Sequence, residues 1–142
     1  MARRCGLGFA SPSHKEKTKL DNPTRGRERR FPEFLTAENC YISEWLNQED
    51  DEAVSVARVR VDPSQRTALH RLRGTTERYL MLSGHGRVEV DGRQRDVGPG
   101  DVVRIEAGQS QRITNTGKDK LAFLAICTPR FQPACYEPVA EE

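Results

Sequence analysis

The sequence lacks long apolar runs, and its few cysteines are not spaced for metal binding. No stretch approaches the roughly 20 apolar residues that a membrane-spanning helix needs, so we expect no membrane span. The four cysteines form no C-x-x-C pair and no zinc-type Cys/His cluster; they are Cys5, Cys40, Cys127 and Cys135. The apolar stretch at the N-terminus is shorter than a secretory core of about 7–15 residues. These features predict free thiols and a cytoplasmic protein.

Acidic and basic residues nearly balance over the whole chain, with a net charge of +2, but they are unevenly distributed. Residues 1–30 hold nine Lys/Arg and three Asp/Glu, whereas residues 31–142 hold fourteen and eighteen. This excludes a globally basic nucleic-acid binder, and we do not expect nucleic acid as a partner. Residues 1–30 have almost no apolar periodicity and predict a basic extension of low order, either a polyanion-binding arm or a solvated segment. Residues 31–142 predict a single domain.

No segment shows a sustained 3.6-residue period, although residues 32–37 are compatible with one helical turn. From Phe31 onward, short runs of β-branched and aromatic residues are separated by Gly, Pro and Asp. Eight strands are expected, at residues 40–46, 53–61, 67–72, 77–82, 86–90, 101–105, 111–116 and 121–128. Asp91-Gly92 is a hairpin signal. Short strands at these intervals predict an all-β sandwich or barrel.

Two motifs in the middle of the chain carry a family resemblance. The first is matched by His70, Glu77 and Gly84, with Ser64 replacing a Gly and Leu72 a second His. The second is matched by Gly100, Gly108 and Asn115, with Glu106 replacing a Pro and Gln111 a His. With these spacings, residues 40–128 resemble the cupin superfamily, and within it the small single-domain bacterial cupins whose metal motifs are degenerate. The resemblance implies a double-stranded β-helix, also called a jelly-roll barrel.

The resemblance also implies a metal site. In cupins the two His, the Glu and the later His bind one divalent metal inside the barrel. The matching positions here are His70, Glu77 and Gln111, because Leu72 cannot ligate. The implied cofactor is therefore a weakly held divalent ion such as Mn, Fe, Ni or Zn, and this oxygen-rich set suits Mn²⁺ or Fe²⁺ best.

Strand parity places Glu77 and Tyr79 on one face of a strand, which in cupins lines the barrel interior. A carboxylate there is costly unless a metal, an imidazole or a ligand satisfies it. His70, Glu77 and Tyr79 are therefore the candidate catalytic residues. The alternatives are a core His70 bonded to Glu77 or Gln111, and a Tyr79 that merely fills the barrel.

The sequence supports three functional hypotheses. The first is a cupin that binds a small polar metabolite, as a metal-dependent isomerase, lyase or dioxygenase; some similar cupins are labelled sugar-phosphate isomerase-like. The isomerase or lyase would act on a small carbohydrate or carboxylate. The second is a non-catalytic sugar- or metabolite-binding cupin whose metal site has degenerated, with Leu72 and Gln111 in place of His. The third is an interaction protein that uses the basic extension, residues 1–30.

A homodimer is also expected, with residues 31–46 as an edge or exchanged strand.

Overall fold

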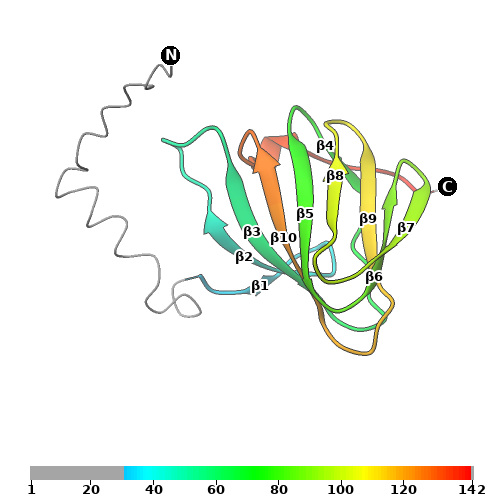
Figure 1. Ribbon diagram of the computed structural model, residues 1–142. Coiled ribbons are helices and arrows are strands. Elements are labelled where there is room, and N and C mark those ends of the chain that lie inside the picture. Colours follow the sequence, from blue (N-terminus) through cyan, green and yellow to red (C-terminus); the bar gives the residue numbers. More distant parts are fainter. Residues whose placement is uncertain (1–30, 142) are drawn as a thin grey trace, which may run out of the picture. The chain divides into compact units, whose positions relative to one another are not determined.

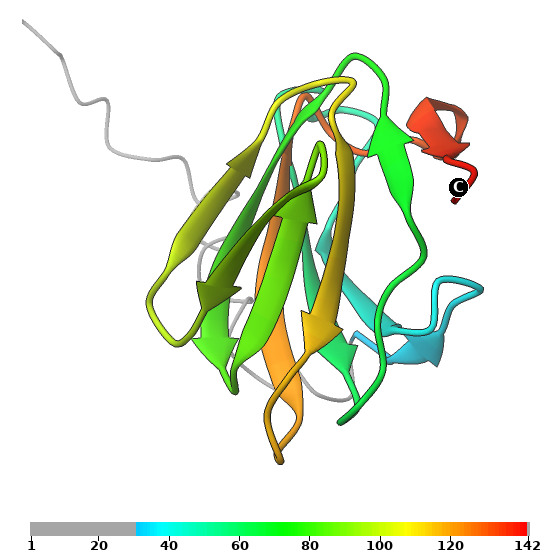
Figure 2. The same ribbon diagram turned by 90° about the vertical axis from the view of Figure 1, so that its right-hand side faces the viewer.

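The computed structural model describes residues 31–141, which form two antiparallel sheets that face each other (Figure 1; Figure 2). The predicted basic extension and Cys5 lie outside the described residues. The first sheet has the order β1-β2-β3-β10-β5-β8 and the second β11-β4-β9-β6-β7. The strands of the first sheet are β1 (Phe34–Leu35), β2 (Tyr41–Leu46), β3 (Ser55–Val61), β10 (Leu121–Thr128), β5 (Thr76–Ser83) and β8 (Val102–Ile105). Those of the second are β11 (Tyr136–Pro138), β4 (His70–Leu72), β9 (Ser110–Asn115), β6 (Gly86–Val90) and β7 (Arg93–Val97).

The core lies between the inner faces of the two sheets. Side chains on β5 and β9 alternate between buried and partly exposed positions along most of each strand, as a two-residue period requires. Val59, Met81 and Phe123 come from the first sheet, and Val88 and Ile113 come from the second. The predicted all-β jelly-roll architecture is confirmed, and the only helical element of residues 31–141 is the single 3₁₀ turn Pro133–Cys135.

The prediction of a helical turn at residues 32–37 is wrong. Phe34 and Leu35 form β1 and pair with Ile42 and Tyr41 of β2. Pairing with an existing strand satisfies their backbone groups, which an isolated helical turn would leave largely unbonded. The expected strand 67–72 is shorter than predicted, since only His70–Leu72 is extended in the sheet.

Besides β1, the sequence analysis missed two further strands. β7 has the sequence RQRDV, with four exposed residues out of five, so it carries no hydrophobic alternation. It is the edge strand that pairs with β6 across the predicted Asp91-Gly92 turn. β11 is only three residues long and pairs with β4. β7 itself has no apolar alternation, and β11 pairs with a strand that lies far earlier in the sequence, so local composition indicates neither of them.

Asn115 ties the turn between β9 and β10 to β3. Its Nδ2 donates to the carbonyl oxygens of Val61 and Asp119, each at 2.9 Å, and its Oδ1 accepts from the Gly117 N–H at 2.9 Å. Asn115 is 2% exposed, so these bonds satisfy the buried amide at the Asn position of the second motif.

Among residues 31–141, Cys40, Cys127 and Cys135 are free thiols. No helix in this part of the chain is long and apolar enough to span a membrane.

Candidate functional site

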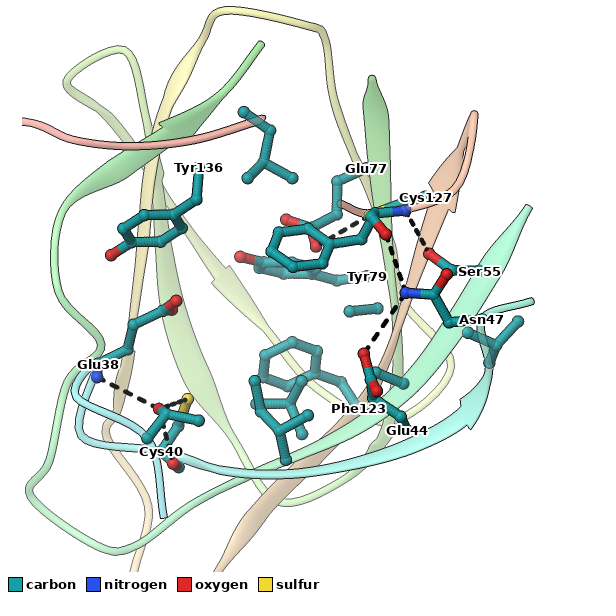
Figure 3. A pocket seen from close by; sticks show the side chains of 18 of the residues that line it. Glu38, Cys40, Glu44, Asn47, Ser55, Glu77, Tyr79, Phe123, Cys127 and Tyr136 are labelled. Carbon is teal, nitrogen blue, oxygen red and sulfur yellow. Dashed lines mark hydrogen bonds between the residues drawn. The ribbon is translucent and has the colours of Figure 1, made fainter. Parts of the chain in front are cut away.

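A cavity of about 260 Å³ lies within the barrel and is lined by residues of both sheets. Its walls are mainly apolar, and they include Val59, Leu72, Phe123 and Ala125. Three residues predicted as catalytic, His70, Glu77 and Tyr79, all contribute to the wall. Figure 3 shows Glu38 and Tyr136 on one side of the cavity, opposite Glu77, Tyr79 and Cys127.

Glu77 is a buried carboxyl group whose hydrogen bonding is incomplete. The residue is 8% exposed, on the inward face of β5. Its Oε2 accepts a hydrogen bond from the Cys127 thiol at 3.5 Å, but Oε1 is buried without a partner among the described residues. Burial raises the pKa of the Glu77 carboxyl, and the nearby His70 opposes this rise. The chain therefore holds a carboxyl group with an unsatisfied oxygen in a cavity wall, which is costly without a ligand.

His70 on β4 is oriented by its backbone surroundings. Its Nδ1 lies 2.8 Å from the carbonyl oxygen of Ala68, which can only accept, so Nδ1 carries the proton in this bond. In the neutral ring Nε2 is then left as the acceptor. The imidazole stacks on Tyr136 with ring centroids 4.9 Å apart. The alternative of a core histidine bonded to Glu77 or Gln111 is not the arrangement found, because His70 bonds to Ala68 instead.

Glu38 is a second carboxyl group in the site. Its Oε2 lies 3.9 Å from His70 Nδ1. Burial raises the pKa of Glu38, while His70 opposes the rise. His70 is therefore flanked by two carboxyl groups, Glu38 and Glu77, both of which favour the protonated form more than an exposed glutamate does.

Tyr79 and Gln111 form a buried pair next to Glu77. The Tyr79 hydroxyl donates a hydrogen bond to Gln111 Oε1, and the Tyr79 ring packs on Phe123 with centroids 4.4 Å apart. Burial raises the pKa of Tyr79 well above its ordinary value, so the hydroxyl stays protonated as a donor. Gln111 is fully buried and does not line the cavity. Its amide lies near enough to oppose the rise in the pKa of Glu77, yet Nε2 makes no hydrogen bond of good geometry.

The residues predicted as metal ligands fit a metal poorly. His70 and Glu77 face one cavity, but the Gln111 oxygen that would ligate already accepts the Tyr79 hydroxyl. Leu72, at the position of a second histidine in the motif, presents an apolar side chain to the cavity. Within residues 31–141 no three His, Cys, Asp or Glu side chains are grouped to hold a metal ion. We therefore derive no chemical step through a metal.

Sequence reasoning missed Glu38 and Tyr136. Glu38 lies in the turn before β2, where a polar residue ordinarily indicates a solvated loop. Tyr136 begins β11, a strand with no local signal. Tyr136 reaches the site because β11 pairs with β4. Glu38 reaches it because its carbonyl oxygen accepts a hydrogen bond, 3.1 Å long, from the N–H of Ala68, two residues before His70.

The architecture and this interior site define a small β-barrel protein with a ligand-sized cavity, and comparison with known proteins identifies the family. Residues 57–127 match the model of the cupin domain, so the chain belongs to the cupin family. The resemblance inferred from the two motifs is confirmed.

A curated protein and a crystal structure, both from Thermotoga maritima, are similar to this chain. The curated relative is the oxalate-binding protein, 36% identical over 70 residues, which are 49% of this chain and 58% of that protein. The chain thus spans little more than half of the length of this relative. A crystal structure described as a predicted oxalate decarboxylase matches with a TM-score of 0.65 and 26% identity, covering 70% of this chain and 93% of the other.

More distant structures share the fold alone. Streptomyces Pac13 with uridine matches with a TM-score of 0.67 at 14% identity, over 78% of this chain and 85% of the other. KdgF from Halomonas matches with a TM-score of 0.66 at 13% identity, over 75% and 94%.

Proposed function

We propose that this cupin binds a small organic molecule in its interior cavity, with the polar end of the ligand at Glu77 and His70. The observation that carries the proposal is the unpartnered, buried Oε1 of Glu77 in the wall of a cavity of about 260 Å³. An unpaired buried carboxyl oxygen costs about 1–3 kcal/mol or more, and a ligand donor group would remove that cost. The cavity is of a size that suits a molecule of about a dozen non-hydrogen atoms.

Proton transfer to and from the bound molecule is the chemistry that this pair supports. Burial raises the pKa of Glu77, which makes its carboxyl a better proton donor near neutral pH than an exposed glutamate. The Nε2 of a neutral His70 is an acceptor, so the two residues provide an acid and a base for isomerisation or elimination. Tyr79 has its hydroxyl engaged by Gln111 and is proposed as a positioning residue rather than as a proton donor.

Non-catalytic binding is the second candidate function. The specific observation that favours it is the apolar Leu72 in the cavity wall together with the engaged oxygen of Gln111, which leaves no complete metal site. A weakly held divalent metal on His70, Glu77 and Gln111 is a separate proposal that rests on the family motifs. A carbohydrate or a carboxylate as ligand is likewise a proposal, and the name of the Thermotoga maritima relative points to oxalate in particular.

A homodimer and a cytoplasmic location are also proposals. The exposed Phe34 and Leu35 on the edge strand β1, which are 51% and 63% exposed, support the dimer because an uncovered apolar edge favours pairing.

Filling the cavity tests ligand binding directly. Ala57 lines the cavity, so Ala57→Phe is expected to reduce binding of compounds of about twelve non-hydrogen atoms at least about tenfold, since the added ring occupies their space. The measurement is a ¹H–¹⁵N spectral titration of the full chain with a mixed panel of neutral, cationic and anionic compounds.

Val102→Phe is the matched control, because it adds the same bulk at a position that is 54% exposed and outside the cavity wall. This variant should bind the panel as the parent protein does. Binding that survives Ala57→Phe unchanged, in a protein whose spectrum shows it to be folded, would place the ligand elsewhere and overturn the proposal.

A further inference from the structure

The carboxyl groups in the cavity wall outnumber its basic side chains, of which His70 is the only one among residues 31–141. Three carboxyl groups line it, those of Glu38, Glu44 and Glu77, and among residues 31–141 no lysine or arginine does. Figure 3 shows these three glutamates at separate points around the cavity, not side by side in one cluster. An anionic ligand would be desolvated beside three carboxyl groups, and the only basic side chain in the wall, His70, already lies 3.9 Å from Glu38 Oε2.

Aromatic rings form much of the remaining wall. Phe34, Phe123 and Phe131 contribute, together with Tyr79 and Tyr136. Such rings present negative faces that attract a cation, and the attraction is stronger when both groups are desolvated. One face of the Tyr136 ring is already covered by the His70 imidazole, so a ligand cation would contact the other rings of the wall.

An independent observation identifies where a positive group would contact the wall. Glu77 is more than nine-tenths buried, lines the cavity, and has one oxygen with no hydrogen-bond partner in the described chain. A neutral donor would supply one hydrogen bond there, whereas an ammonium group would supply the bond and the opposite charge. Bonds between charged groups are roughly twice as strong as those between neutral ones.

We infer that the ligand is a small organic cation, a primary amine or a quaternary ammonium ion with an apolar body, held by Glu77 and the aromatic wall. The inference rests on the proposed function of the cavity as a binding site, and it goes further by assigning the ligand class. It argues against the carboxylate ligands among the candidates proposed above and predicts that dicarboxylates such as oxalate are excluded.

Two pairs of probes of matched shape test the assignment: choline against 3,3-dimethylbutan-1-ol, and benzylamine against benzyl alcohol. Calorimetric titration of the full chain is expected to show the cation of at least one pair binding about tenfold more tightly than its neutral partner. Oxalate should show no binding. Glu77→Gln and Glu38→Gln, which keep the side-chain shape, should each reduce the preference for the cation at least about threefold and leave the affinity for the alcohol within about twofold.

Glu106→Gln is the matched control, because Glu106 is an exposed carboxyl group outside the cavity wall and should leave all affinities unchanged. Equal affinities within both pairs, tighter binding of oxalate, or a preference that survives both cavity variants would overturn the cation assignment. In those cases the proposed function stands as long as some compound of the panel binds and Ala57→Phe blocks it. If no probe or panel compound binds the parent protein, the proposed function itself fails.

Discussion

Replacing Phe123 with alanine is expected to lower the free energy of unfolding by about 3–5 kcal/mol. Phe123 is 2% exposed at the centre of the first sheet, and its ring packs on Tyr79 with centroids 4.4 Å apart. It belongs to the core cluster and also borders the cavity of about 260 Å³. The vacated volume would therefore join an existing void, and the surrounding strands could not collapse to fill it.

Urea denaturation followed by circular dichroism measures this loss. Phe34→Ala is the matched control, because Phe34 also lines the cavity but is 51% exposed, and we expect a loss below about 1 kcal/mol. Similar losses in the two variants would mean that the cavity region collapses easily and that Phe123 does not support its shape.

Glu77→Gln is expected to make the ligand-free protein more stable at neutral pH, by about 1–3 kcal/mol. Burial raises the pKa of Glu77 above its ordinary value of 4.5, so the folded chain binds this proton more tightly than the unfolded chain does. In the parent protein the contribution of Glu77 to stability is therefore highest below pH 4.5 and falls as the pH rises through the folded pKa.

The free energy of unfolding of Glu77→Gln minus that of the parent protein should therefore increase with pH. It should be small near pH 4 and should grow with pH until the carboxyl group is fully ionised in the fold. Thermal denaturation at several pH values measures it, and the titratable groups that do not interact with Glu77 cancel in the difference. A flat difference, such as we expect for Glu106→Gln on the surface, would show that Glu77 is not desolvated as the geometry implies.

These two variants bear on the function as well as on stability. A residue whose replacement stabilises the empty protein carries a cost that the fold alone does not explain, and such costs are typical of binding and catalytic sites. Glu77 has that property, since its oxygen lacks a partner in the wall of a cavity. Phe123 has the opposite property, because it supports both the core and the cavity shape.

Much of the barrel could be predicted from strand parity and motif spacing. Glu77, Tyr79 and Met81 are all buried on one face of β5, and Gln111, Ile113 and Asn115 are buried on one face of β9. A two-residue period is local, so it is visible in sequence wherever one face of a strand is buried. The prediction failed at β7 and β11, where a polar edge strand and a three-residue strand have no such period.

The candidate site was only partly predictable, because some of its contacts join strands of different sheets and leave no local pattern in the sequence. His70, Glu77 and Tyr79 were found because family motifs mark their strands, and the structure brings all three to the cavity wall. Gln111 was expected to point at a metal, but its oxygen is used by Tyr79 instead. Sequence cannot show this, because the bond joins residues 79 and 111, which lie on different sheets.

The amino-acid sequence by itself determined the all-β class, the cupin family and the strands that carry the candidate residues, because these depend on local period and on spacing along the chain. Only the tertiary structure decided the chemistry of the cavity. The acidic and aromatic wall gathers Glu38, Phe131 and Tyr136 from segments outside the two motifs. Their burial, their neighbours and the resulting rise in the pKa of Glu38 and Glu77 arise from long-range packing, which removes water from these side chains only when the sheets meet.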